Sequence, residues 1–264
     1  MPEFDLDAYL ARIGYDGPRT VCGETLAALQ LAHATHIPFE NLDVLLGQRI
    51  ALDSESLQAK LVTARRGGYC FEQNTLLLHA LESLGFTVTR LLARVRYRSV
   101  TLRPRTHLLL RVELEGTVWL VDVGFGSEGL LQPLPLVEGQ PQTHGDWHYR
   151  LLREGTTWVL QSISNTGWKD LYAFTDELSY GIDVEVASHY TSTHPDTIFK
   201  KVLTVQLPGL TQRTYLRNHE LVTETATSTT TQPLTEPELL PLLTERFGLS
   251  LPEEVIHRLW ITCG

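Results

Sequence analysis

A pair of glycines that leads straight into a helical pattern is the feature that most constrains the fold of this chain. The stretch reads Arg65-Arg66-Gly67-Gly68-Tyr69-Cys70-Phe71-Glu72-Gln73-Asn74. Beyond it, Leu77, Leu81 and Leu84 recur with the spacing of one helix face, and Gly85 is typical of a helix C-terminus. Because glycine accepts a positive φ, the pair predicts a sharp turn. We therefore expect a helix over residues 70–84 with Cys70 in its first turn.

A cysteine at the start of a helix is suited to nucleophilic catalysis. The thiolate is the reactive form, but an ordinary thiol with a pKa of about 8.5 is only a few per cent ionised at neutral pH. The unpaired N–H groups at a helix N-terminus and a neighbouring imidazolium both stabilise a thiolate. The alternative for Cys70 is a structural role, because free cysteines are among the most buried residues and most of them are inert.

A histidine and an aspartate that complete such a nucleophile lie in a predicted hairpin. Residues 107–114 alternate between apolar and polar side chains, and residues 117–123 form a second strand-like run after a turn at Glu115-Gly116. Adjacent antiparallel strands bring Asp122 close to His107. A carboxylate on one ring nitrogen fixes the tautomer and supports the imidazolium, which leaves the other nitrogen to face sulfur.

The composition limits the classes of protein and of partner. A chain of 264 residues with 42% hydrophobic types is long enough for one to three compact units. No run approaches the roughly 18 apolar residues of a membrane span, and the acidic first residues do not resemble a signal peptide. The net charge of −9 disfavours a nucleic-acid partner. Cys22, Cys70 and Cys263 lack the spacing of a disulfide framework or a zinc site, so we expect a cytoplasmic protein without a metal.

Further elements are expected on both sides of the hairpin. Helical patterns cover residues 5–12, 24–36, 53–64, 176–188 and 252–260, and another helix opens at residue 235. Strand patterns cover residues 87–97, 148–153, 157–163, 198–207 and 213–224. Residues 131–146 have no periodicity and predict a loop. The first region is therefore expected to be helical, and the strands after it to form a barrel or sandwich.

The chain resembles the arylamine N-acetyltransferases in several segments. Residues 66–74 look like that family's nucleophile motif throughout, and residues 36–42 (His-Ile-Pro-Phe-Glu-Asn-Leu) are similar to its upstream signature. Residues 122–126 (Asp-Val-Gly-Phe-Gly) are similar to the segment with the triad aspartate, and residues 190–196 resemble a further segment toward the third domain. From residue 206 onward the match is loose.

The resemblance implies a fold and an activity. The fold is α+β, a papain-like cysteine transferase with a helical bundle in residues 1–85, a β-barrel in residues 86–190 and an α/β lid in residues 191–264. The implied triad is Cys70, His107 and Asp122. The implied reaction is a ping-pong transfer of an acetyl group from acetyl-CoA, through an acetyl-cysteine, to arylamines or arylhydrazines. No metal is implied, and homo-oligomerisation is an open question.

Several other residues are candidates for contacts with the substrates. Phe39 and Phe125 are expected to form walls of an aromatic acceptor pocket, Tyr69 to flank the cleft, and Val95 to line it by family resemblance. Core packing is the alternative for each ring. Gly126 is expected to leave backbone N–H groups exposed near the thioester, as an oxyanion hole requires.

Charged residues have two expected roles. Glu40 and Arg66 carry opposite charges in two of the motifs and are expected to form a buried structural pair. CoA is an anion, so a chain with a net negative charge needs local cations or backbone N–H groups to hold it. Residues 200–201, Arg213 and Arg217 are candidates for that task, with a solvated strand edge as the alternative for each.

Three other functions compete with this interpretation. A macrolactam-forming amide synthase shares the nucleophile motif and acts on a carrier-bound polyketide. A cysteine hydrolase would use water in place of the amine. A non-catalytic ligand-binding module would have a broken triad, whereas all three residues are present here.

Overall fold

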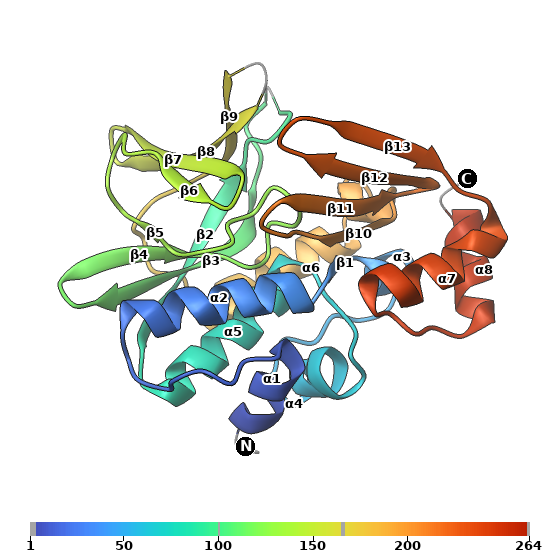
Figure 1. Ribbon diagram of the computed structural model, residues 1–264, viewed down its shortest axis with the longest axis horizontal. Coiled ribbons are helices and arrows are strands. Elements are labelled where there is room, and N and C mark those ends of the chain that lie inside the picture. Colours follow the sequence, from blue (N-terminus) through green and yellow to red (C-terminus); the bar gives the residue numbers. More distant parts are fainter. Residues whose placement is uncertain (1–3, 100, 165–166, 263–264) are drawn as a thin grey trace.

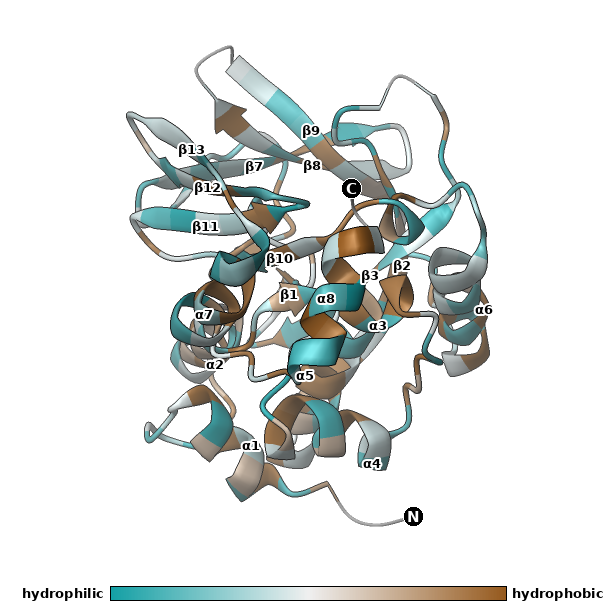
Figure 2. Ribbon diagram, turned by 90° about the vertical axis from the view of Figure 1, so that its right-hand side faces the viewer, coloured by the Kyte–Doolittle hydropathy of each residue, from teal (hydrophilic) through white to brown (hydrophobic). Residues whose placement is uncertain are grey.

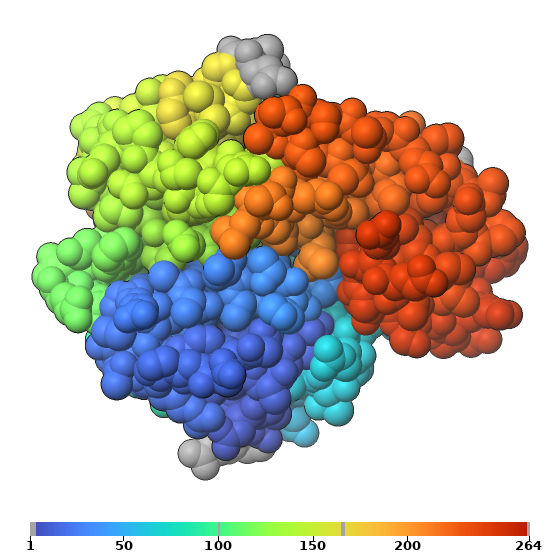
Figure 3. All heavy atoms as spheres, in the orientation of Figure 1, coloured from blue at the N-terminus to red at the C-terminus, as the bar shows by residue number. Residues whose placement is uncertain are grey.

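The computed structural model describes residues 4–99, 101–164 and 167–262 and combines helices with two antiparallel sheets (Figure 1). In the view of Figure 1 most of the helices of the first 85 residues lie below the larger sheet, and the C-terminal helices lie at the outer end of the smaller sheet. The space-filling view in the same orientation shows these regions packed against one another (Figure 3). Among the described residues, no helix has both the length and the apolar composition that crossing a bilayer requires.

The helices of the first region begin and end where the sequence supplies caps. The Asp5 side chain accepts a hydrogen bond from the N–H of Ala8 at 2.9 Å, and Asp53 caps a later helix in the same way. Gly14 and Gly85 take the left-handed conformation that ends two helices. The elements are α1 (Leu6–Ile13), α2 (Gly23–His36), α3 (Leu42–Leu45), α4 (Ser54–Leu57), its π-helical continuation Gln58–Thr63, and α5 (Cys70–Leu84).

The larger sheet is entirely antiparallel and curves into a nearly closed, barrel-like layer (Figure 1). Its strand order is β5-β4-β3-β2-β9-β8-β7-β6. The predicted hairpin is confirmed, since Glu115 and Gly116 both have a positive φ, as a two-residue turn between twisted strands requires. The strands are β2 (Thr87–Val95), β3 (Arg105–Leu114), β4 (Thr117–Val121), β5 (Leu134–Pro135), β6 (Gln142–His144), β7 (Trp147–Glu154), β8 (Thr157–Ser164) and β9 (Gly167–Phe174).

The smaller sheet combines one strand from the first region with strands from the last. Its order is β1-β10-β11-β12-β13, and β1 pairs with β10 so that Phe39 lies opposite Gln206. The outer strands β12 and β13 carry mainly hydrophilic residues (Figure 2). The elements are β1 (Phe39–Glu40), α6 (Gly181–Thr193), the 3₁₀ turn Ile198–Lys200, β10 (Thr204–Leu207), β11 (Gln212–Arg217), β12 (Glu220–Thr225), β13 (Thr229–Pro233), α7 (Glu236–Phe247) and α8 (Glu253–Thr262).

Three groups of buried apolar residues hold these layers together. The largest group joins α1, α2 and α5 to the inner face of the larger sheet, so helices and barrel share one core. A second group lies between the smaller sheet, α3, α7 and α8. The third group surrounds Cys70 and includes Phe39, Tyr69, Leu92 and Leu108. The predicted nucleophile therefore lies where the helical region, the larger sheet and α6 meet.

Several predicted boundaries were wrong. Residues 131–146 are not only loop, because they contain the two short strands β5 and β6. The strand expected over residues 213–224 is a hairpin that turns at Asn218, whose φ is +50°. Residues 198–200 form a 3₁₀ turn, and the helix expected at 176–188 is shifted to α6. Strand β9 was not predicted.

Candidate active site

Cys70 is the first residue of α5, as the sequence predicts. The carboxylate of Glu72 accepts a hydrogen bond from the N–H of Tyr69 at 3.1 Å, which fixes the start of the helix. The side chain of Cys70 is buried, and its Sγ lies 3.8 Å from the carbonyl oxygen of Thr106 in β3. The helix thus presents its N-terminal N–H groups around a thiol that faces the strand with His107.

The two glycines before Cys70 are needed for space and not for a positive φ. Only Arg65 in this turn has a left-handed φ, +52°. A Cβ on Gly67 would lie 2.0 Å from the carbonyl oxygen of Pro38, and one on Gly68 would lie 2.7 Å from Oε2 of Glu72. The turn therefore packs its backbone against β1 and against the cap of α5, which no larger residue permits. The predicted reason for the glycine pair was wrong, although the predicted turn is present.

His107 and Asp122 form the second part of the site. Nε2 of His107 lies 2.7 Å from Oδ2 of Asp122, and both side chains are almost completely buried. The other ring nitrogen, Nδ1, is left to interact with the sulfur of Cys70. A hydrogen bond with Cys70 and the charge of its sulfur both contribute to raising the pKa of His107. The hairpin of β3 and β4 brings the two residues together, as predicted from the sequence.

Electrostatics in the pair favour an imidazolium next to a carboxylate. Burial lowers the pKa of His107, but the charge and hydrogen bond of Asp122 outweigh it and raise that pKa to about 10. Burial likewise raises the pKa of Asp122, and the His107 charge together with the hydrogen bonds to the carboxylate brings it below its ordinary value. His107 therefore keeps its positive charge at neutral pH, which is the condition for stabilising a thiolate.

Asn74 connects the helix of Cys70 to Asp122, a role that the sequence interpretation missed. Its Nδ2 donates to Oδ1 of Asp122 at 2.9 Å and to the carbonyl of Leu108 at 2.7 Å. Its Oδ1 accepts from the N–H of Val123 at 3.0 Å. The signal was available, because residues four apart share one helix face and Asn74 is four residues after Cys70.

The loop after Asp122 lies directly on the start of α5. A Cβ on Gly124 would lie 2.6 Å from the Cα of Cys70, and one on Gly126, whose φ is +88°, would lie 2.4 Å from Oε1 of Gln206. That same Oε1 accepts from the N–H of Ser127 at 2.7 Å. Both glycines are therefore required where the loop contacts the helix on one side and β10 on the other.

Two aromatic rings pack on the imidazole of His107. The ring of Phe125 is 5.2 Å away in an edge-on arrangement, and the ring of Tyr172 in β9 is 4.8 Å away. Phe125 is only partly buried, whereas Tyr172 is fully buried. Tyr172 was missed because its strand was not predicted.

The other predicted pocket residues lie in two places. Phe39 and Tyr69 both belong to the buried group around Cys70 and pack against Phe199. The hydroxyl of Tyr69 is hydrogen-bonded to Ser188 in α6, so this ring joins α5 to α6. Val95 lies at the end of β2, where it lines a separate cavity on that side of the sheet.

The predicted pair of Glu40 and Arg66 is present and extends into a larger group. Nη2 of Arg66 lies 2.6 Å from Oε1 of Glu40 and 2.9 Å from Oδ1 of Asp43. Lys60 contacts both Asp43 and Glu72 at 2.6 Å. Burial, as the largest influence, raises the pKa of Glu72 to about 7. This group joins β1 and α3 to the turn before Cys70.

Arg213 is not available to bind an anion, which corrects one expectation. It is buried, its Nη1 lies 3.2 Å from Oε2 of Glu128, and its guanidinium lies 3.7 Å above the ring of Trp147. Arg213 therefore joins β11 of the smaller sheet to the loop after Asp122 and to β7. No group of three potential metal ligands is present within the described residues.

Comparison with known proteins agrees with this geometry. A family model described as N-acetyltransferase matches residues 24–256. The chain is 43% identical over 255 residues to the arylamine N-acetyltransferase of Mycolicibacterium smegmatis, and this match covers 94% of the chain and 92% of that protein. The crystal structure of the Nocardia farcinica arylamine N-acetyltransferase superposes with a TM-score of 0.93 at 42% identity and covers 99% and 94% of the two chains.

A second solved structure brings in a ligand. It is the Mycobacterium marinum arylamine N-acetyltransferase in complex with CoA, which has a TM-score of 0.93 at 34% identity and covers 98% of this chain and 100% of that one. The similarity in both sequence and structure extends over nearly the whole length. The chain belongs to the arylamine N-acetyltransferase family.

Proposed function

We propose that this chain transfers an acetyl group from acetyl-CoA to arylamines or arylhydrazines through a thioester on Cys70. The observation that carries the proposal is the pair of His107 and Asp122, which holds a positive charge beside a thiol at a helix N-terminus. The relatives described above are arylamine N-acetyltransferases. None of them supports a macrolactam-forming alternative.

In the first half-reaction, the sulfur of Cys70 attacks the acetyl carbonyl of the donor and the CoA thiolate leaves. In the described part of the chain, the backbone N–H groups of Cys70, Phe125 and Gly126 donate to no protein acceptor. We assign them to the oxyanion that forms on the carbonyl, because preorganised N–H groups stabilise such charge. The departing thiolate takes a proton from His107.

In the second half-reaction, the amine attacks the acetyl-cysteine. His107 accepts the proton that the amine loses, and the Cys70 thiolate leaves. Phe125 is the wall for the aromatic ring, since it is the aromatic neighbour of His107 that retains exposed surface. An arylamine is neutral at pH 7 and can attack directly, whereas most aliphatic amines are protonated there.

Three less specific predictions accompany this function. Residues 1–85, 86–190 and 191–264 are proposed as bundle, barrel and lid, although the shared core and the pairing of β1 with β10 join them. A reducing cytoplasm suits a working thiol and the free Cys22. The third prediction is a homo-oligomer, which the molar mass of the protein in solution tests.

The test is the intact mass of the protein after exposure to acetyl-CoA alone. We expect one acetyl group, located on Cys70 by peptide mapping and removed when aniline is added. The Cys70→Ala variant should carry none, and Cys22→Ala, which removes the other described thiol, should behave as the wild type. An acetyl group that persists in Cys70→Ala, or none in the wild type, contradicts the proposal.

A further inference from the structure

Two polar side chains, Gln30 and His33, lie on the buried face of α2. Both are completely buried, and Leu26 and Leu29 occupy the same face of the helix. Because Gln30 and His33 are three residues apart, they are neighbours on this face. Burying a polar group costs free energy unless it finds hydrogen-bond partners. The partners of these two side chains therefore show which segments α2 holds in place.

His33 holds the first turn of α5 through the side chain of Gln73. Nε2 of His33 lies 2.7 Å from Oε1 of Gln73. The amide nitrogen of Gln73 donates to the carbonyl of Pro38 at 2.8 Å and to that of Gly68 at 3.3 Å. Gly68 lies two residues before Cys70, and Gln73 lies three residues after it. This amide therefore joins the start of α5 to the turn that leads into it.

The hydrogen bonds around His33 run in one direction. Three carbonyl oxygens accept from the nitrogen of Gln73, so its oxygen has to accept from His33. Nε2 of His33 therefore carries the hydrogen, and Nδ1 accepts from the hydroxyl of Tyr9 in α1 at 2.9 Å. Burial lowers the pKa of His33 to about 4, so the ring is neutral and keeps this tautomer at neutral pH.

Gln30 holds the other side of the site. Its Nε2 donates to the backbone carbonyl of Asp122 at 3.2 Å and to that of Leu130 at 3.4 Å. The carboxylate of Asp122 in turn holds His107. One helix thus contacts the segment with the thiol through His33 and the segment with the carboxylate through Gln30.

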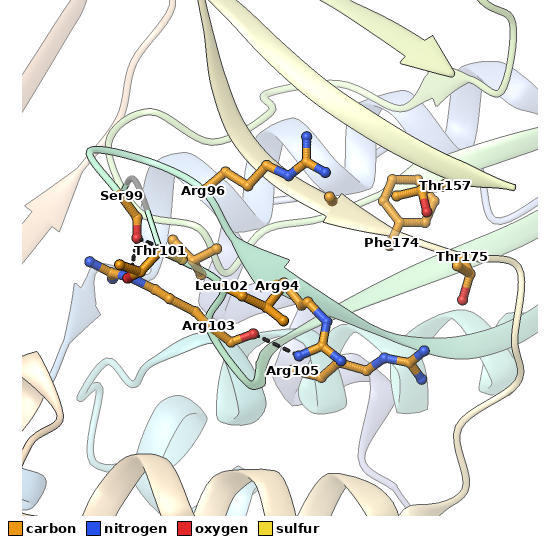
Figure 4. Close-up of a pocket in the computed structure, with 12 residues that line it drawn as sticks. Arg94, Arg96, Ser99, Thr101, Leu102, Arg103, Arg105, Thr157, Phe174 and Thr175 are labelled. Carbon is orange, nitrogen blue, oxygen red and sulfur yellow. Dashed lines mark hydrogen bonds between the residues drawn. The ribbon is translucent and has the colours of Figure 1, made fainter. Parts of the chain in front are cut away.

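A cavity at the ends of β2 and β9 has arginines in its wall but gives the site no such support (Figure 4). Arg94 and Arg105 lie opposite each other there, on strands that continue into the site. Arg94 donates to the carbonyl of Arg103, and Arg105 pairs with Glu177. Within the described residues, neither guanidinium is hydrogen-bonded to the thiol, the imidazole or the carboxylate of the site.

We propose that α2 sets the distance between Cys70 and the pair of His107 and Asp122, with His33 and Gln30 as its positioning residues. His33 acts on the start of α5, and Gln30 acts on the backbone of Asp122. The distance matters because the attraction between thiolate and imidazolium falls with separation, and a reacting group displaced by about 1 Å can lose about 100-fold in rate. The inference rests on the proposed function for its rate measurement.

The first test compares two substitutions of His33. His33→Leu removes the donor to Gln73, whereas the amide of His33→Gln places a donor near the same position. We expect the rate of Cys70 acetylation by acetyl-CoA to fall about tenfold or more in His33→Leu. In His33→Gln the rate should stay within about threefold of the wild type, because the contact with Gln73 is restored.

Tyr9→Phe is the matched control, because it removes the hydrogen bond on the opposite side of the same ring. The variant should unfold at a lower temperature than the wild type, since a buried ring nitrogen loses its donor. Its acetylation rate should nevertheless stay within about twofold of the wild type, because the contact between His33 and Gln73 is intact.

A second readout follows the charge of the thiol itself. Alkylation of Cys70 by iodoacetamide, measured by peptide mapping, increases with the thiolate fraction. In His33→Leu and in Gln30→Met the midpoint of its pH profile should move toward the ordinary thiol value of about 8.5, because the sulfur is displaced from the imidazolium. The control is Leu243→Ala, which loses stability in the apolar group between the smaller sheet, α3, α7 and α8 and should keep the wild-type midpoint.

Two results overturn the inference. The first is a wild-type midpoint in His33→Leu and Gln30→Met despite a lower unfolding temperature, which means that α2 serves the fold alone. The second is an equal loss of acetylation in His33→Leu and His33→Gln. If His33→Leu does not fold, the midpoint of Gln30→Met decides. Alkylation needs no acyl donor, so a wild type without acetyl on Cys70 contradicts the proposed function, while the midpoints still decide the role of α2.

Discussion

At the scale of single residues, Asp122 determines the charge of its neighbour. Burial alone lowers the pKa of His107, and the carboxylate at 2.7 Å reverses the effect and brings the pKa to about 10. A histidine whose pKa is higher in the folded than in the unfolded state adds stability at low pH. That contribution is fully present below about pH 6.5, the unfolded value, and is lost as the pH rises through about 10.

The variant Asp122→Asn tests whether stability falls with rising pH in this way. It removes the charge that keeps His107 protonated. The variant should therefore not show the loss of stability that the wild type undergoes as the pH rises through about 10. We expect the free energy of unfolding in urea to be lower in the variant than in the wild type at pH 7. The difference between the two proteins should narrow by more than about 1 kcal/mol by pH 10. A difference between the two proteins that is the same at both pH values would show that the pair is not ionised in the folded protein.

The residues of the site differ in how far the sequence reveals them. Cys70, His107 and Asp122 follow from a helix start and a two-residue hairpin, which are local patterns. The role of Gly67 and Gly68 does not, because the atoms that exclude a side chain there belong to Pro38 and Glu72. Arg213 was misjudged for the same reason, since its partner Glu128 is 85 residues away in the sequence.

At the scale of elements, the loop after β4 and the start of α5 are packed backbone against backbone. Gly124 permits this contact, because a Cβ would lie 2.6 Å from the Cα of Cys70. We expect Gly124→Ala to destabilise the protein by about 1–3 kcal/mol, as overpacking does, and to reduce acetylation of Cys70 at least tenfold by shifting the helix start from His107.

Thermal unfolding and the rate of acetylation by acetyl-CoA measure these two effects. Gly23→Ala is the matched control, because Gly23 opens α2 and a Cβ there would meet nothing within 4 Å. It should leave both quantities unchanged or raise stability slightly, since alanine favours the helix. Normal acetylation by Gly124→Ala would show that the contact does not position Cys70.

Elements with a clear period were predictable, and elements defined by distant partners were not. Helices α2 and α5 and strands β3, β4, β7 and β8 follow the spacing of their apolar residues. Strand β9 is buried along its second half, and its buried residues do not alternate with exposed ones. No periodic pattern in the sequence therefore indicates this strand. Strand β1 is two residues long and exists because β10, far along the chain, pairs with it.

At the scale of the whole molecule, two side chains of the smaller sheet hold the loop that lies on Cys70. Gln206 of β10 accepts from the N–H of Ser127, and Arg213 of β11 pairs with Glu128. Glu128 also contacts Lys169 of β9 at 2.6 Å, so the pair links both sheets. The proposed lid therefore does more than cover the site, because it fixes the position of the loop with the predicted oxyanion N–H groups.

Arg213→Leu separates these roles. Removing the guanidinium leaves Glu128 buried with Lys169 as its remaining ion pair, so we expect a loss of about 1–3 kcal/mol in the free energy of unfolding. A looser loop also admits water to the acetyl-cysteine, and the acetyl-enzyme formed without an amine should decay several-fold faster than in the wild type. Arg217→Leu, on the same strand but exposed, is the control and should change neither quantity. If the acetyl-enzyme of Arg213→Leu decays at the wild-type rate despite the lower stability, the ion pair serves the fold alone, and the exclusion of water must come from residues nearer to Cys70.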